Sequence, residues 1–332
     1  MISFKGHRES RPRQRLVTLP SIVLCATVVS LVAGAVAVWL WQTTGNSKWV
    51  QEFFQYPGAL FLVGASAFEV ALCFQCLRGF SVGEPLAGAW LLLFVAAACH
   101  FTGSVISEVL GAASRLNPIA WWRPGAPPEI FAEVRALGLT LGGPVRWLFL
   151  ACGLFLVLRV YRRTGLLGRF RQTDWLLVMG TVTYLLLETG SVIVALRTGK
   201  VFSLRQQIDW FNDPLLLVLM IEAILIYRSL VASGLGLVTR CWGAYMLAIA
   251  FTHLGDLGLF AHAYGYAPWP VQAITWHIWF IASGLFALAP AYQMEAVRRI
   301  RLSVKAVALR RTNLYAPLRN MTAPWSGSSL VR

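Results

Sequence analysis

The chain has 332 residues, of which 57% are hydrophobic and 13% are charged. Soluble domains carry about 25% charged residues, so the composition excludes an ordinary soluble enzyme and a disordered chain. The formal net charge of +15 does not indicate nucleic acid as a partner, because the basic residues lie in short segments between long apolar runs. Composition therefore predicts a protein that is embedded in a lipid bilayer.

Eight apolar runs are each long enough to cross a bilayer, which takes about 20 residues of helix. The runs have no strand-like alternation, and in lipid the backbone must satisfy its own hydrogen bonds, so we expect helices. The predicted spans are 21–42, 58–78, 88–111, 141–161, 174–196, 214–232, 238–262 and 269–292. The expected fold is thus an all-α bundle of eight transmembrane helices.

The distribution of Lys and Arg predicts the orientation of these spans. With the N-terminus inside, the inner segments hold 21 basic residues and the outer segments hold 8. This bias predicts an N-in, C-in topology, with a basic cytosolic N-terminus at 1–20 and a basic cytosolic tail at 293–332. Few lysines among many arginines suggest a bacterial chain, so we expect the inner membrane, with anionic lipids against the basic inner face.

An internal repeat is indicated by two of the spans. The segments 146–161 and 277–292 are identical at six of sixteen positions. In earlier spans, Glu69 and His100 are 31 residues apart, and Glu222 and His253 have the same separation. The similarity predicts two tandem four-helix units.

The first unit covers 21–171 and the second covers 172–292, and we expect a pseudo-twofold axis along the membrane normal to relate them. Parallel repeats of this kind occur in transporters, whose substrate sites lie near the midplane between the halves. Duplicated helices also serve as scaffolds, so the repeat by itself leaves the function open.

Several ionisable residues fall inside the predicted spans. Such a residue is expensive in lipid and is a functional-site hypothesis by default. On a helix, residues three or four apart are neighbours, so these side chains are expected to form inward-facing polar stripes. The candidate ligand or proton site consists of Glu69, His100, Glu188, Glu222, His253 and Asp256.

Three functions remain open for this set. Glu, Asp and His could bind or transport an ion, a proton or a small solute. Alternatively, the protein is a redox subunit in which His100, His253 and His277 ligate haem b or a transition metal. Glu69 and Glu222 would then be carboxylates that accept hydrogen bonds from the ligating histidines. As a third alternative, Glu–His hydrogen bonds only join helices in a non-catalytic sensor or scaffold subunit, with another membrane protein as its partner.

Two further chemistries are excluded or not expected. A retinal Schiff base is excluded because none of the four lysines lies in a span. The sequence shows no recognisable pairing of a nucleophile with a general base, so enzymatic activity is not expected.

Overall fold

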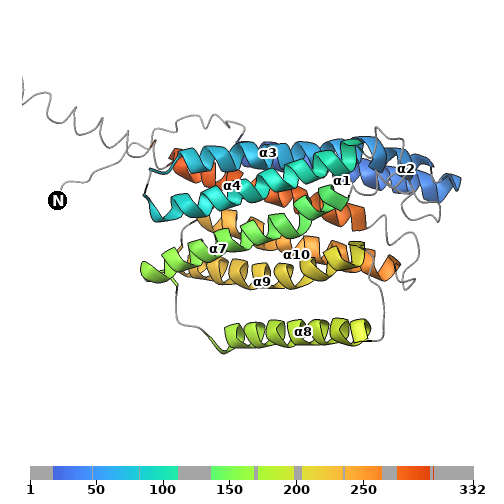
Figure 1. Cartoon of the computed structure of the whole chain (residues 1–332). Helices are drawn as coiled ribbons and strands as arrows, with labels where there is room; N and C mark the ends of the chain where they lie inside the picture. Colours follow the sequence, from blue (N-terminus) through green and yellow to red (C-terminus); the bar gives the residue numbers. More distant parts are fainter. Residues whose placement is uncertain are drawn as a thin grey trace, which may run out of the picture.

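The computed structural model describes residues 18–46, 48–81, 83–110, 136–167, 171–197, 204–234, 236–263, 275–299 and 302. In these ranges the regular structure is entirely helical, as expected (Figure 1). The first half contains α1 (Leu19–Thr44), α2 (Lys48–Phe53), α3 (Ala59–Arg78), α4 (Pro85–Ser104) and α7 (Arg146–Arg163). The second half contains α8 (Gln172–Arg197), α9 (Leu204–Ser233), α10 (Leu237–Ala263) and a last helix, Thr275–Arg299.

Six helices among the described residues are long and apolar enough to cross a membrane. They are Leu19–Thr44, Tyr56–Arg78, Pro85–Ser107, Ala136–Arg163, Pro214–Ser233 and Thr275–Arg299. These coincide with six of the predicted spans, so the chain has the fold of a helical, multi-pass membrane protein. The predicted fifth and seventh spans coincide with α8 and α10, which are helices of 26 and 27 residues.

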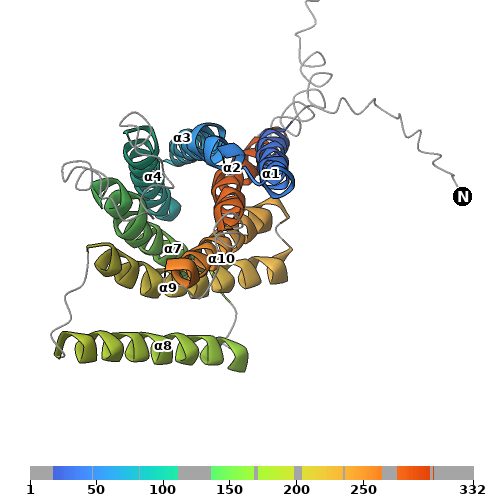
Figure 2. The same ribbon diagram turned by 90° about the vertical axis from the view of Figure 1, so that its right-hand side faces the viewer.

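The last helix, Thr275–Arg299, lies at the centre of the packing. Its Phe286 belongs to the main apolar core with residues of α3, α4, α7, α9 and α10. Its Phe280 packs with α1 and α2, and its Ala287 packs with α1 and α3. Figure 2 shows this helix, in orange-red, between the α1–α3 side and the α10 side of the bundle. One helix therefore joins three apolar clusters.

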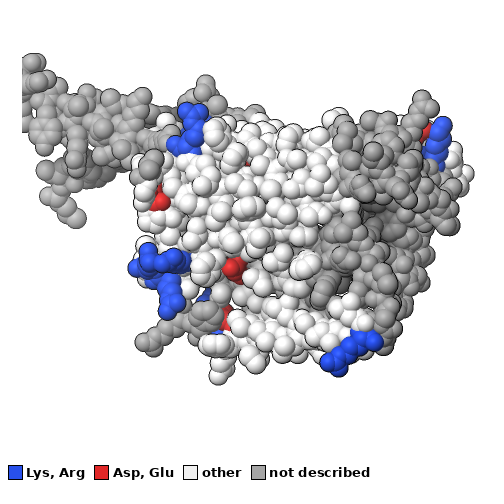
Figure 3. All heavy atoms as spheres, in the orientation of Figure 1, with Lys and Arg blue, Asp and Glu red and all other residues white. Residues whose placement is uncertain are grey.

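The helix α8 lies at the edge of the bundle, beside α9 (Figures 1 and 2). Apolar side chains such as Leu176, Leu186 and Leu187 are 68–72% exposed on it. Its attachment includes an ion pair between Asp174, which is buried, and Arg228 of α9. In Figure 3 the basic groups lie at the two ends of the visible face, and its middle is almost uncharged. This distribution suits lipid rather than water around the middle of the helices.

Three helices depart from α geometry at one end. The π-helical segment η1 (Phe54–Gly58) precedes α3, η2 (Val105–Leu110) follows α4, and η4 (Leu141–Val145) precedes α7. In the predicted topology all three lie toward the outer side. Single π turns inside α-helices are frequent at functional sites, and the helices that carry η2 and η4 contribute side chains to the candidate site described below.

Candidate functional site

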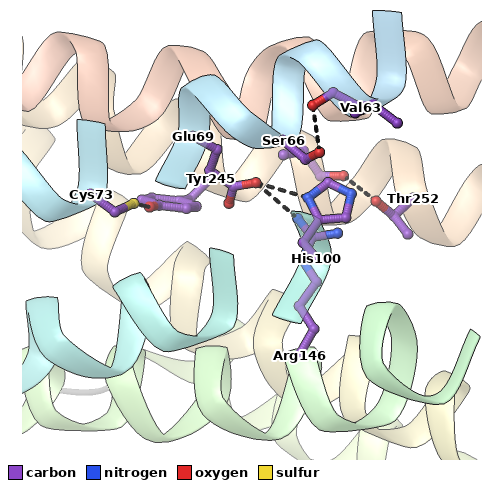
Figure 4. Close-up of polar contacts among 9 residues, drawn as sticks. Val63, Ser66, Glu69, Cys73, His100, Arg146, Tyr245 and Thr252 are labelled. Carbon is purple, nitrogen blue, oxygen red and sulfur yellow. Dashed lines mark hydrogen bonds and ion pairs between the residues drawn. The ribbon is translucent and has the colours of Figure 1, made fainter. Parts of the chain in front are cut away.

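A buried carboxylate on α3 is the centre of the candidate site. Glu69 is 4% exposed, and its Oε2 lies 2.9 Å from Nδ1 of His100 on α4. The same oxygen lies 3.7 Å from Nη2 of Arg146 on α7. A carboxylate only accepts hydrogen bonds, so Nδ1 of His100 carries the hydrogen when Glu69 is ionised. Figure 4 shows the imidazole and the guanidinium approaching this one carboxylate.

The guanidinium of Arg146 is enclosed by aromatic rings. Its Cζ lies 4.3 Å from the ring centroid of Trp147 and 4.0 Å from that of Phe286, and the side chain is only 5% exposed. A desolvated cation over an aromatic face gains about 2 kcal/mol. The rings therefore offset part of the cost of holding Arg146 away from water, and they restrict the directions in which it can move.

A second polar contact lies next to Glu69 on the same helix. Sγ of Cys73, one turn after Glu69 on α3, lies 3.7 Å from the hydroxyl of Tyr245 on α10. Figure 4 shows Cys73 beside the Tyr245 hydroxyl. The Tyr245 ring packs edge-on against Phe286, the ring that also covers Arg146. Four helices, α3, α4, α7 and α10, thus bring polar side chains to one place inside the bundle.

Glycines allow the backbones to come close enough for these contacts. A Cβ at Gly103 of α4 would lie 2.6 Å from the carbonyl oxygen of Gly138 and 2.6 Å from the backbone nitrogen of Gly142. Only glycine fits this crossing without displacement of the backbone. His100 is one turn before Gly103 on the same helix face. The crossing therefore brings His100 and the helix of Arg146 to the same carboxylate.

The described hydrogen bonds do not join the other predicted site residues to this cluster. No hydrogen bond joins Glu222 to His253 in the described part of the chain, where Oε2 of Glu222 and Nδ1 of His253 are both buried without a partner. Asp256 accepts a hydrogen bond from Nε1 of Trp279 at 3.2 Å. The two Glu–His pairs therefore differ in their hydrogen bonding.

Two predicted residues have different neighbours or lie outside the description. His277 packs near Phe280, with a ring-centroid distance of 6.2 Å, and against Gly34 of α1. Glu188 belongs to α8, but its side chain lies outside the described residues. Neither is brought to the Glu69 cluster by the described contacts.

The metal hypothesis has limited support in this geometry. The contact of Glu69 with Nδ1 of His100 resembles the carboxylate that commonly orients a ligating histidine. Within the described ranges, however, there is no group of three or more His, Cys, Asp or Glu that could hold a metal ion.

Sequence reasoning did not include Arg146 and Tyr245 in the site. Arg146 stands near the start of the fourth predicted span, a common place for an interfacial arginine. A usable signal was the glycine pair Gly142-Gly143 just before it, because glycines permit close approach of a neighbouring helix. Comparison with known proteins adds no assignment: no family model, no curated protein sequence and no solved structure matches the chain.

Proposed function

We propose that the chain binds and transports protons, alone or coupled to an ion or small solute, through the cluster of Glu69, His100 and Arg146. The observation that carries this proposal is the sharing of one carboxylate oxygen between two basic side chains from different helices. A proton needs no preformed cavity, and buried acid–histidine chains are the usual proton relays of membrane proteins.

The chemistry follows from the two nitrogens of His100. A proton binds Nε2, and the imidazolium then passes its Nδ1 hydrogen to Oε2 of Glu69 across the 2.9 Å hydrogen bond. The imidazole returns to the neutral form, and Glu69 becomes a neutral acid. Its attraction for Arg146 is then lost. One proton thus changes the pairing among three helices, which is what coupling to movement requires.

The membrane arrangement proposed with this function has eight spans, N-in and C-in, in the inner membrane. At a rise of 1.5 Å per residue, α8 and α10 are each about 40 Å long, which exceeds the hydrocarbon core of about 30 Å. The basic inner segments then contact anionic lipids. The two four-helix units remain part of the proposal.

Proton uptake into liposomes tests the function directly. The purified protein is reconstituted with a pH-sensitive dye inside, and an imposed pH gradient should give protein-dependent uptake. Glu69→Gln should abolish uptake because an amide cannot accept the proton, and Glu52→Gln is the matched control because Glu52 is exposed and pairs with Lys48. Uptake by Glu69→Gln equal to that of the parent protein would overturn the proposal.

His100→Asn distinguishes a proton relay from a structural lock, that is, a Glu69–His100 hydrogen bond that only holds two helices together. The asparagine amide can still donate one hydrogen bond to Glu69, but it cannot move a proton from one side of a ring to the other. A relay predicts a folded protein without uptake. A lock predicts that both Glu69→Gln and His100→Asn retain the parent's behaviour, with a loss of no more than about 1–2 kcal/mol of stability.

A further inference from the structure

From the packing of η4 we infer that Asn212 is a positioning residue of this site, the alternative hydrogen-bond partner of Arg146 when Glu69 is protonated. The inference rests on the proposed proton function. It concerns α9, a helix that contributes no side chain to the contacts around Glu69 described above. Four observations carry it.

The first is a kink immediately before Arg146. In η4, Gly143 has non-helical angles, φ −105° and ψ −105°, and Pro144 follows it. Proline removes a backbone donor and disrupts the regular hydrogen-bond ladder. A π turn also contains one residue more than an α turn, so its loss would shift the chain by about 1.5 Å. The backbone before Arg146 therefore lacks the regular hydrogen-bond ladder of an α-helix.

The second observation is that Asn212 lies against this kink. A Cβ at Gly143 would lie 3.0 Å from Oδ1 and 3.1 Å from Nδ2 of Asn212. Gly142, on the same segment, instead faces Gly103 of α4. The segment is thus held between α4, which carries His100, and α9, which carries Asn212, with no side chain of its own between them.

The third observation is a mismatch of hydrogen-bonding groups. Nη2 of Arg146 and Oδ1 of Asn212 are both buried and, in the structure as described, neither has a hydrogen-bond partner. One is a donor and the other is an acceptor. A buried polar group without a partner costs about 1–3 kcal/mol and calls for an explanation. A second conformation, in which Arg146 donates a hydrogen bond to Asn212, explains why both groups lack a partner here.

The fourth observation is the loose contact of Arg146 with Glu69. The separation of 3.7 Å exceeds the usual hydrogen-bond length of about 2.9 Å. Gly143, which packs against Asn212, is three residues before Arg146 in the sequence. Arg146 therefore does not fully engage its carboxylate, and the backbone three residues before it packs against an amide oxygen that lacks a donor.

The switch follows from these contacts. When Glu69 is ionised, the guanidinium stays near it; when Glu69 takes a proton, Arg146 turns to Oδ1 of Asn212. The titratable and charged groups that face Glu69 are His100 from α4, Arg146 from α7, Tyr245 from α10 and Cys73 from its own helix. Of these, Arg146 is the group whose position Asn212 controls.

Infrared spectroscopy of the full-length protein in lipid nanodiscs tests the switch. The signal is the carboxylic-acid band that disappears in Glu69→Gln, followed as a function of pH. Asn212→Leu removes the acceptor and keeps Arg146 at Glu69, so the midpoint of the band should move to lower pH. Asn212→Asp draws Arg146 away with a full charge, so the midpoint should move to higher pH. We expect about one pH unit each way, a tenfold change in proton affinity.

Two further variants control for disturbed folding. Gly143→Ala keeps the asparagine at position 212, but the added Cβ pushes its amide away from η4. This variant should shift the midpoint of the band in the same direction as Asn212→Leu. Gln293→Leu removes another amide whose buried Oε1 has no partner, on the last helix, and should leave the midpoint unchanged.

The failure of each idea has its own signature. A Glu69 band that titrates but does not shift, or that shifts the same way in Asn212→Leu and Asn212→Asp, would overturn the role of Asn212 and leave the proton function standing. If no band disappears in Glu69→Gln at any pH, Glu69 never takes a proton, and both proposals fail.

Discussion

The crossing at Gly103 gives the sharpest prediction for stability. In Gly103→Ala, the added Cβ meets backbone atoms of Gly138 and Gly142 at 2.6 Å, well inside van der Waals contact. Backbone cannot rotate away as a side chain can, so the two helices must separate. Overpacking of this kind typically costs about 1–3 kcal/mol. Separation of the helices also moves His100, one turn away, from Glu69.

A matched control lies on the same helix. A Cβ at Gly88 of α4 would meet only Cδ1 of Leu156, at an ordinary 3.6 Å. Gly88→Ala should therefore be neutral or gain up to about 1 kcal/mol, because alanine loses less entropy than glycine in a helix. The two alanine variants should differ by about 1–4 kcal/mol.

Reversible unfolding in mixed detergent micelles measures this difference. The signal is tryptophan fluorescence, since Trp90 of α4 and Trp147 of α7 are both buried. Proton uptake by each variant gives the functional readout, which should fall only in Gly103→Ala. Equal unfolding free energies for Gly103→Ala and Gly88→Ala would refute the argument that the crossing is limited by glycine.

Three further predictions address topology, the attachment of α8 and cofactor content. A reporter fused after Arg332 should be cytosolic and one inserted near Gly125 should be outside; both on one side would contradict eight spans. Asp174→Asn should lower the free energy of unfolding by about 1–2 kcal/mol, because Arg228 loses its charged partner from a buried site, and an unchanged value would show that α8 is held by apolar contacts alone. Purified protein, made with haem supplied, should lack a Soret band under the proton proposal; a band that is lost in His100→Ala would favour the haem alternative instead.

The sequence by itself determined the class of the protein. Long apolar runs with basic flanks predict membrane helices because a lipid-exposed backbone has no other way to satisfy its hydrogen bonds. Six of the predicted spans meet the criteria for crossing helices, and the other two are long helices. Glu69 was predicted to lie on an inward-facing polar stripe, and it is buried on α3 together with Ser66, Cys73 and Cys76.

Only the tertiary structure decided which polar residues meet. Glu69 is hydrogen-bonded to His100, whereas Glu222 and His253 are not joined, although the two pairs have the same separation in sequence. Spacing fixes the face of a helix on which a residue lies, but the contact depends on how the helices cross, and here the crossing depends on the close approach of Gly103 to Gly138 and Gly142.

The placement of helices was equally beyond the sequence. The helix α8 is rich in apolar side chains, yet it lies at the edge, while the last helix lies at the centre of the packing. Lipid chains and a protein interior are similarly apolar, so hydropathy detects a membrane helix without telling which neighbour it will contact. That choice depends on close packing and on a few polar contacts, and these exist only once the helices are assembled.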